Sequence, residues 1–253
     1  MTKQIIAVVN QKGGVGKTTS VINVATYMSI LGRKVLIIDL DPQGNATSGL
    51  GINREAVKLS SYNLILGHKN LEDVMVDMRF KNLKIIPSNN DLSGAEVEMV
   101  SVLNREYLLK NALLKSDFDY IFIDCPPSLG LLTINALTAA DHILIPVQTE
   151  YYALEGLSQL LATYQAIKQS TNPDIGILGV ILTMYDKRTT LSAQVKEEIT
   201  KYFKDFVFDV NIPRNVRLAE APSHGKAIPE HDKWSRGAKA YKNLTKEILS
   251  RLE

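Results

Sequence analysis

The stretch that decides the fold is Lys12-Gly13-Gly14-Val15-Gly16-Lys17-Thr18-Thr19, which joins a short apolar run, Ile5–Val9, to a segment of helical periodicity. Glycines let the backbone turn tightly and point its N–H groups at phosphate oxygens, and a helix beginning near Lys17 adds the positive end of its dipole. Lys17 would then reach the β- and γ-phosphates of a nucleotide, Thr18 would ligate Mg²⁺, and Thr19 would bond near the α-phosphate. The stretch predicts a phosphate-binding loop; the alternative is a glycine-rich turn with two surface lysines.

This loop departs from the standard phosphate-loop pattern at its first position. The pattern G-x-x-x-x-G-K-[ST] begins with glycine, whereas Gln11 stands here, and a second lysine, Lys12, precedes the paired glycines. From the start of the loop, Lys12 could extend out of its own subunit toward a second nucleotide.

Short apolar runs alternate with helical patterns along the rest of the chain. The runs are almost continuously apolar, as in strands buried on both faces of a parallel sheet, and Gly32 is placed to end the first helix. Repeated strand–helix–strand units predict an α/β fold, a doubly wound, mostly parallel sheet flanked by helices. No linker or repeat divides the chain, so we expect a single domain over residues 1–253. The expected strands are Ile5–Val9, Val35–Ile38, Leu83–Ile86, Tyr120–Ile123, Ile143–Val147, Ile177–Leu182 and Phe206–Val210.

The residues with unusual chemistry follow these strands directly. Segments 10–19, 39–45, 124–130 and 148–152 each come after an expected strand. Because ligands of such folds bind beyond the carboxyl ends of the strands, we expect these segments to meet at one edge of the sheet.

Two carboxylates follow the second strand. Asp39 ends it and Asp41 lies two residues on, so both would face the phosphates if the extended geometry persists. Phosphoryl transfer depends on positioning and charge neutralisation more than on a strong base, so we expect Asp41 to orient the attacking water. The alternative is a pair of capping aspartates.

A third carboxylate ends the fourth strand. Tyr120–Ile123 is followed by Asp124, the Walker-B pattern, which is expected to hold Mg²⁺ through a coordinated water. Thr18, Asp41 and Asp124 are therefore the expected metal-site residues. Cys125 has no activating partner nearby in the sequence and is expected to be a buried filler.

The composition is that of an ordinary globular protein. Of 253 residues, 45% are hydrophobic and 22% charged, and the single Cys125 excludes an intrachain disulfide and a four-cysteine metal site. No apolar run approaches the roughly 18 residues of a membrane span, and none resembles a signal peptide, so a cytoplasmic protein is expected.

The net charge of +2 averages two unlike parts of the chain. Residues 1–183 hold 15 Lys and Arg against 17 Asp and Glu, whereas residues 184–253 hold 14 against 10. The basic excess in the last quarter suggests either an anionic partner or a solvated surface of mixed charge.

Five segments together resemble the ParA/Soj family of partition ATPases, within the wider MinD-like group of P-loop NTPases with a deviant Walker A loop. They span nearly the whole chain, and the last two are more specific than the phosphate loop. The segments are Lys-Gly-Gly-Val-Gly-Lys-Thr-Thr (12–19), Asp-Leu-Asp-Pro-Gln-Gly-Asn-Ala-Thr (39–47), Ile-Asp-Cys-Pro-Pro-Ser-Leu-Gly (123–130), Glu-Tyr-Tyr-Ala-Leu-Glu-Gly-Leu (150–157) and Ile-Pro-Arg-Asn-Val-Arg-Leu-Ala-Glu-Ala-Pro-Ser-His-Gly-Lys (212–226).

The resemblance implies an ATPase that uses ATP and Mg²⁺ and forms a sandwich homodimer with two nucleotides at the interface. Lys12 would contact the phosphates in the partner subunit and act with Lys17 and Asp41 in catalysis, and the loop with Pro213 and Asn215 would lie beside the adenine. The ATP-bound dimer would bind double-stranded DNA of the nucleoid without sequence preference. A ParB-type centromere-binding protein would stimulate hydrolysis and so reset the cycle that segregates chromosome or plasmid DNA.

The residues expected to contact DNA lie in the basic last quarter. By the resemblance, Arg188 and Arg217 best match the family's DNA-contacting arginines, and the further candidates are Lys201, Arg214 and Arg236; for each, a solvated side chain is the alternative. A binder without sequence preference needs phosphate contacts and no base-reading module, and none precedes the phosphate loop. The resemblance also assigns segment 150–152 and the helix after it to a dimer or partner surface.

A MinD-type membrane-cycling ATPase is the main rival. Tyr241, Leu244, Ile248 and Leu252 form an apolar stripe at helical spacing, which would lie on the protein core or on lipid; the mixed charges opposite favour the core. An iron–sulfur relative would need cluster cysteines that the chain lacks. A small-molecule kinase remains a third alternative, although no segment is typical of an acceptor pocket.

Overall fold

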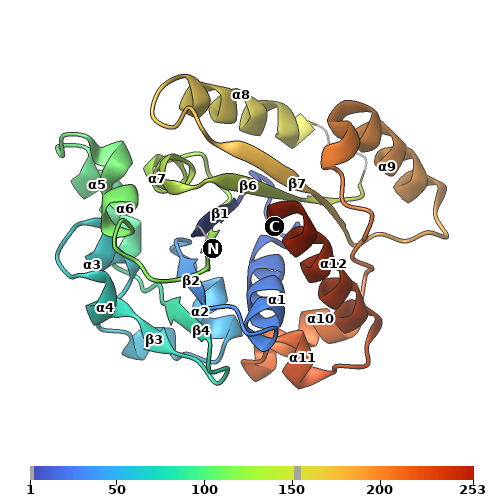
Figure 1. The fold of residues 1–253 in the computed structure, drawn as a ribbon, viewed down its shortest axis with the longest axis horizontal. Helices are drawn as coiled ribbons and strands as arrows, with labels where there is room; N and C mark the ends of the chain where they lie inside the picture. Colours follow the sequence, from blue (N-terminus) through green and yellow to red (C-terminus); the bar gives the residue numbers. More distant parts are fainter. Residues whose placement is uncertain (1–2, 151–154) are drawn as a thin grey trace.

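A seven-stranded sheet runs through the computed structural model, which describes residues 3–150 and 155–253 (Figure 1). The strand order is β3-β4-β2-β5-β1-β6-β7, and every pair is parallel except β3 with β4. The α/β architecture expected from the sequence is therefore confirmed. The strands are β1 (Gln4–Val8), β2 (Val35–Asp39), β3 (Val76–Asp77), β4 (Leu83–Ile86), β5 (Tyr120–Asp124), β6 (His142–Gln148) and β7 (Gly176–Thr183).

Helices cover both faces of the sheet, and each layer has its own hydrophobic core. Helices α1, α2, α10, α11 and α12 pack on one face, and α3 to α9 pack on the other. The α-helices are α1 (Lys17–Ile30), α2 (Asn45–Gly49), α3 (Ser61–Ile65), α4 (Leu71–Val74), α5 (Leu92–Met99), α6 (Leu108–Ala112), α7 (Leu131–Ala139), α8 (Glu155–Gln169), α9 (Thr190–Phe203), α10 (Val216–Glu220), α11 (Ile228–His231) and α12 (Arg236–Leu252). Short 3-10 helices lie at Arg54–Ala56, Arg105–Tyr107, Lys204–Phe206 and Ala221–His224.

The two cores explain why the strands are continuously apolar. In β1, Ile5 and Ala7 face the core beneath α3 to α9, while Ile6 and Val8 face the core beneath α1 and α12. A strand covered on both sides has no solvent-facing positions for polar residues.

The expected strand at Phe206–Val210 is wrong. Val207 forms an isolated bridge to β7, and the N–H of Phe208 donates to the carbonyl of Val180 at 3.0 Å. The next two N–H groups, of Asp209 and Val210, donate to the carboxylate of Glu247 on α12 at 2.8 and 3.1 Å. A side chain thus takes the donors that a further strand would need, and the apolar residues of the segment serve the core rather than a ladder.

The last helix, α12, packs against α1. Tyr241 and Ile248 are almost completely buried there, as predicted for a helix docked on its own core. The Tyr241 hydroxyl lies 3.1 Å from the Ser20 hydroxyl, and the Tyr27 hydroxyl donates to the carbonyl of Ala238 at 3.0 Å. Among the described residues, no helix is both long and apolar enough to cross a membrane.

The parallel register brings the chemically unusual segments together. Asp124 at the end of β5 stands opposite Val8 of β1 on one side and Asp39 of β2 on the other. The loops that leave these strands therefore start side by side at the carboxyl edge of the sheet, where ligands bind in doubly wound folds.

Candidate functional site

The glycine-rich loop between β1 and α1 leaves open space above its backbone. Gly14 and Gly16 have φ angles of +73° and +91°, which side chains rarely adopt, and Gly16 caps the start of α1. No neighbouring atom lies within 4 Å of the position that a Cβ on Gly13 or Gly14 would occupy. Unpaired N–H groups at a helix start together with open space suit an anionic ligand.

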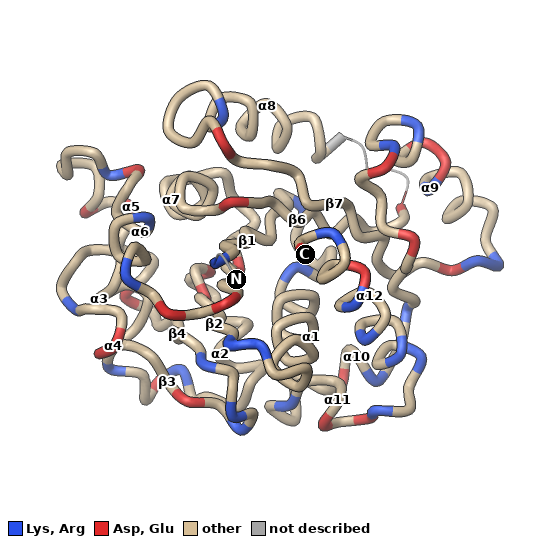
Figure 2. Tube along the Cα trace, in the orientation of Figure 1, with Lys and Arg blue, Asp and Glu red and all other residues tan. Residues whose placement is uncertain are grey.

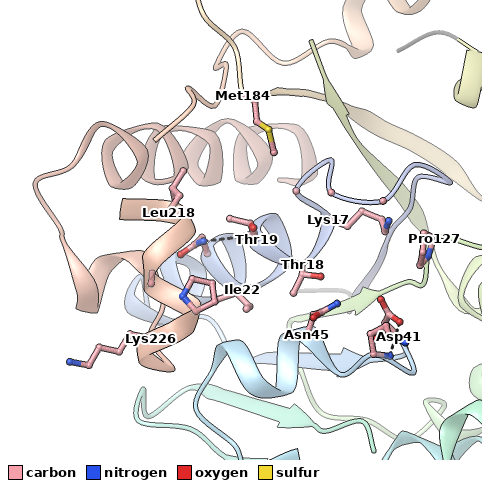
Figure 3. A pocket seen from close by; sticks show the side chains of 17 residues that line it. Lys17, Thr18, Thr19, Ile22, Asp41, Asn45, Pro127, Met184, Leu218 and Lys226 are labelled. Carbon is pink, nitrogen blue, oxygen red and sulfur yellow. Dashed lines mark hydrogen bonds between the residues drawn. The ribbon is translucent and has the colours of Figure 1, made fainter. Parts of the chain in front are cut away.

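A cavity of about 380 Å³ lies over this loop (Figure 3). Asp41 and Asn45 from the segment after β2, Pro127 from the loop after β5, and Lys226 from the C-terminal part complete its wall. Most of the expected phosphate-loop residues line the cavity, namely Gly13, Gly14, Gly16, Lys17, Thr18 and Thr19.

Lys17 is the buried cation of the cavity wall. Its side chain is only 7% exposed, and its Nζ donates to the carbonyl of Lys12 at 3.3 Å. Burial lowers the pKa of Lys17, while Asp124 and Asp41 act in the opposite direction. A buried ammonium group beside open space is stabilised when an anion enters, so this wall suits phosphate oxygens.

The two aspartates after β2 occupy different environments. Asp39 is completely buried and accepts hydrogen bonds from the Thr47 hydroxyl and N–H at 2.6 and 2.8 Å. Burial raises the pKa of Asp39 to about 6, against the hydrogen bonds from Thr47. Asp41 lines the cavity and accepts the N–H of Gln43 at 2.9 Å. The expectation that both carboxylates face the cavity is therefore wrong for Asp39.

Asp124 is a buried carboxylate without a hydrogen-bond partner among the residues that the structure describes. Burial raises its pKa well above the usual range and neighbouring Asp39 raises it further, whereas Thr18 and Lys17 act in the opposite direction. A cation near Asp124 would compensate the buried negative charge.

These oxygen donors fit Mg²⁺. Asp124 is a neighbour of Thr18 and Asp41, which line the cavity. Hard cations prefer such carboxylate and hydroxyl oxygens. Within the described residues, no three His, Cys, Asp or Glu side chains form a group that could hold a metal ion. Phosphates and waters would therefore supply several of the ligands, as Mg²⁺ commonly requires.

Lys12 is not among the residues that line the cavity. Its Nζ forms an ion pair with Glu150 at 2.9 Å, and Gln148 at the end of β6 donates to the other carboxylate oxygen of Glu150. The side chains of Lys12 and Glu150 are 39% and 46% exposed. Of the predicted partner surface, which is segment 150–152 with the helix after it, residues 151 and 152 lie outside the described part of the chain.

The predicted adenine-side residues line an adjoining cavity. Pro213 and Asn215 contribute to this space of about 470 Å³, which shares Gly16, Thr19 and Met184 with the first cavity. The Asn215 side-chain oxygen accepts the N–H of Leu218 at the start of α10, and no residue in the described part of the chain accepts a hydrogen bond from its amide nitrogen. The lining is mainly apolar, as a flat aromatic base would require.

Three of the five predicted DNA-contacting residues lie together. Arg188, Arg214 and Arg236 line a surface groove of about 840 Å³, and Arg188 pairs with Asp186 at 2.7 Å. Figure 2 shows how Lys and Arg recur over α10, α12 and the loops beside them. The other two lie outside this groove.

Those two residues form ion pairs within their own helices. Lys201 pairs with Glu197 on α9 at 2.7 Å, and Arg217 pairs with Glu220 on α10 at 2.9 Å. Both lysine and arginine remain more than half exposed.

Several polar residues that hold the site in place carry no sequence motif. The Thr47 hydroxyl, which donates to Asp39, also accepts the N–H of Ser88 at 2.8 Å. The Ser88 hydroxyl in turn donates to the carbonyl of Asp41 at 2.8 Å. The Thr183 hydroxyl at the end of β7 holds the phosphate-loop backbone at 2.8 Å. The available signal was their position: Ser88 and Thr183 stand at the carboxyl ends of strands.

Comparisons with known proteins cover nearly the whole chain. A family model described as an AAA domain matches residues 3–177. The sporulation initiation inhibitor protein Soj of Bacillus subtilis is 54% identical over 249 residues, 98% of each chain.

Solved structures give the same picture of the fold. The structure of a Mycobacterium smegmatis protein named cobyrinic acid a,c-diamide synthase, with bound ADP and magnesium, is 38% identical with a TM-score of 0.87 and covers 99% of this chain and 96% of that one. A putative plasmid partition protein of Borrelia burgdorferi bound to AMPPNP is 28% identical with a TM-score of 0.83 over the full length of both chains.

Proposed function

This chain belongs to the Soj/ParA family of chromosome-partitioning ATPases, and we propose that residues 1–253 form one ATPase domain that couples MgATP hydrolysis to DNA partition in the cytoplasm. The observation that carries this proposal is the cavity in which the glycine-rich loop, Lys17, Thr18 and Asp41 meet. Family membership and this cavity agree on nucleotide hydrolysis as the core activity.

The phosphate loop binds the phosphates of the nucleotide, and the adjoining cavity binds its adenine. The backbone over residues 13–16 cradles the phosphates, Lys17 neutralises the β- and γ-phosphates, and Thr19 lies near the α-phosphate. Pro213 and Asn215 flank the adenine. The shared wall of the two cavities supports this arrangement, because a nucleotide must span a polar and an apolar compartment.

Hydrolysis uses Asp41 to orient the attacking water. Asp41 lines the cavity. Two hydrogen bonds hold its loop in place: the Asp41 carboxylate accepts the N–H of Gln43, and the Asp41 backbone carbonyl accepts the Ser88 hydroxyl. Thr18 and Asp124 would hold Mg²⁺, which when bound would supply charge neutralisation at the phosphates. Little covalent chemistry is then left to the protein beyond positioning.

Dimerisation uses Lys12 in the partner subunit. Lys12 directly precedes Gly13 of the cavity wall, and its ion pair with Glu150 is partly exposed, so the side chain is accessible to a second copy. We propose that ATP binding brings two copies together with the nucleotides between them. Each Lys12 then contacts the phosphates bound by the other copy.

The ATP-bound dimer binds double-stranded DNA on the nucleoid without sequence preference. The groove formed by Arg188, Arg214 and Arg236 supports this part of the proposal, because clustered guanidinium groups suit a phosphate backbone. Arg217 and Lys201 add contacts outside the groove. A ParB-type centromere-binding partner stimulates hydrolysis and releases the DNA.

Binding to duplex DNA in ADP, in ATP and in a slowly hydrolysed ATP analogue, across a range of salt concentrations, tests the proposal. We expect binding in the two triphosphate states only, with an affinity that falls steeply with salt. Equal binding in ADP and ATP would refute nucleotide control. Because the Mycobacterium smegmatis relative is named a synthase, hydrolysis is measured with and without DNA; an ATPase indifferent to DNA would favour a small-molecule enzyme. Sedimentation with liposomes and ATP excludes or reveals the membrane-cycling alternative.

A further inference from the structure

The residues after β2 that line the cavity share one tight turn. Asp41 and Gln43 belong to it and Asn45 follows it, and all three line the cavity (Figure 3). The turn closes on itself, because the N–H of Gly44 donates to the carbonyl of Asp41 at 2.8 Å. We call residues 41–44 the Asp41 turn. The direction of the Asp41 carboxylate depends on how firmly this turn is held.

Arg54 contacts the Asp41 turn at two points. Its Nη2 donates to the carbonyl of Pro42, which lies 12 residues earlier in the chain. A Cβ on Gly44 would lie 2.7 Å from Cδ of Arg54, and Gly44 has a φ of +63°, so glycine is what lets the arginine side chain pack on the backbone here. These two contacts add to the hydrogen bond from Ser88 to the carbonyl of Asp41.

The chain between the Asp41 turn and Arg54 is itself well anchored. Helix α2 follows the turn, and its Thr47 donates to Asp39 through both the hydroxyl and the N–H. Asn53 then caps the 3-10 helix that begins at Arg54, because its side-chain oxygen accepts the N–H of Glu55 at 3.1 Å. The side chain of Arg54 is half-buried. Its contact with the turn therefore needs little further ordering of the chain.

The guanidinium group of Arg54 is poorly satisfied in this position. Arg54 takes part in no ion pair within the described part of the chain, and its Nε is buried there without a hydrogen-bond partner. Native proteins leave few buried polar atoms unpaired, because each one costs free energy of folding. The hydrogen bond to Pro42 thus stabilises the fold only a little, which favours a role for Arg54 in placing the Asp41 turn.

We propose that Arg54 is a positioning residue for hydrolysis, which holds the Asp41 turn so that the Asp41 carboxylate points at the attacking water. Without the contact at Pro42 the carboxylate would occupy several positions, and fewer bound nucleotides would have a correctly placed water. The phosphates would still be bound, because the glycine-rich loop lies between other elements, β1 and α1. This inference rests on the proposed ATPase activity and names a further residue that the reaction needs.

Steady-state hydrolysis by Arg54→Met tests the proposal. Methionine keeps an unbranched side chain over Gly44 and removes the donor to Pro42. We expect kcat to fall about tenfold, because a displacement of about 1 Å can cost a hundredfold and the contact from Ser88 remains. The KM for ATP and the Kd of a slowly hydrolysed analogue should change less than about twofold, since the lost contact acts on the transition state alone.

Two further variants separate positioning from a general effect. Arg54→Lys should keep kcat within about threefold of the wild type, because an ammonium group can donate to the same carbonyl. Arg105→Met is the matched control: Arg105 donates to the carbonyl of Val100 at 2.7 Å and does not line the cavity. It should leave kcat unchanged. Urea unfolding should give similar midpoints for wild type and Arg54→Met, because removal of the buried Nε offsets the lost hydrogen bond.

Amide hydrogen exchange followed by NMR measures the Asp41 turn without any hydrolysis. In the nucleotide-free chain, the Gly44 amide should exchange severalfold faster in Arg54→Met than in the wild type, because its hydrogen bond to Asp41 opens more often. The Leu40 amide donates to the carbonyl of Asp124 at 3.0 Å. Its exchange rate should be the same in both chains, and it serves as the internal reference.

The proposal is overturned if kcat is unchanged in Arg54→Met, or if Arg105→Met loses as much. A raised KM at unchanged kcat would assign Arg54 to nucleotide binding and overturn it too. Equal losses in Arg54→Lys and Arg54→Met, or unchanged exchange at Gly44, would exclude the hydrogen bond to Pro42 as the cause. A wild-type chain that hydrolyses no ATP, with faster Gly44 exchange in Arg54→Met, would refute the proposed function and still support the contact between Arg54 and the Asp41 turn.

Discussion

Replacing Glu150 with glutamine tests whether the ion pair with Lys12 restrains dimerisation. In the structure, the Lys12 ammonium lies 2.9 Å from Glu150 of its own subunit, so it must leave this carboxylate before it can reach a nucleotide bound by a second copy. Glu150→Gln keeps the shape of the side chain and removes its charge. We expect the variant to dimerise at lower protein concentration in the presence of a slowly hydrolysed ATP analogue.

The magnitude follows from the exposure of the pair. With side chains 39% and 46% exposed, the pair belongs to the partly solvated class that contributes roughly 0.2–1 kcal/mol. A dimer opens two such pairs, so their loss should favour association by about 0.4–2 kcal/mol, or roughly two- to thirtyfold in the dimer dissociation constant. High salt should reduce the difference in dimer dissociation constant between Glu150→Gln and the wild type, because partly exposed charges are screened.

Sedimentation velocity over a range of protein concentrations measures this constant directly. Glu72→Gln is the matched control: it removes the same charge from an exposed carboxylate on α4, and it should leave dimerisation unchanged. Lys12→Ala should have the opposite effect and prevent the dimer while ATP affinity is largely kept. If Glu150→Gln weakened dimerisation, Glu150 would belong to the dimer interface itself and the reasoning would be refuted.

Three further predictions concern the cavity and its surroundings. Asp41→Ala should retain ATP binding but lose nearly all turnover, so that an ATP-bound dimer accumulates; phosphate release and sizing measure both, and wild-type hydrolysis would contradict the role of Asp41. Arg217→Glu should keep ATP affinity, weaken DNA binding and lower the slope of log affinity against log salt concentration by about 1 or more; an unchanged slope would exclude this contact. Thr47→Val leaves Asp39 short of a donor and Ser88 short of an acceptor, so urea unfolding should show a loss of about 2–3 kcal/mol, against less than about 0.5 kcal/mol for the exposed control Thr200→Val on α9.

Much of the nucleotide site could be predicted because its signals are local. The glycine-rich loop has its sequence pattern within eight residues, and Asp124 follows a run of four apolar residues. Such signals need no knowledge of distant partners. The buried strands were predictable for the same reason, since continuous apolar character reports burial on both faces.

The supporting contacts could not be predicted because their partners are distant in sequence. The hydrogen bond between Ser88 and Thr47 spans 41 residues, and the bonds from Asp209 and Val210 to Glu247 span nearly as many. The latter also explains why an apolar segment was mistaken for a strand. Strand β3 escaped notice because its two residues are exposed and carry no burial pattern.

The pairing of Asp39 with Thr47 shows a different limit. Two carboxylates in the sequence Asp39-Leu40-Asp41 are equivalent by pattern, and only the position of α2 decides which one is buried. Spacing alone therefore identified the pair of aspartates but assigned the same orientation to both.

The packing of α12 against α1 has a consequence for biosynthesis. α12 follows every other described element in the chain, so the ribosome makes it after all of them, and at about 5–20 residues per second its 17 residues take about 1–3 s. Until then the face of α1 that carries Ser20 and Tyr27 lacks its cover, although α1 begins at the phosphate loop. We therefore expect a nascent chain to bind nucleotide tightly only after this helix has been made and has packed on α1.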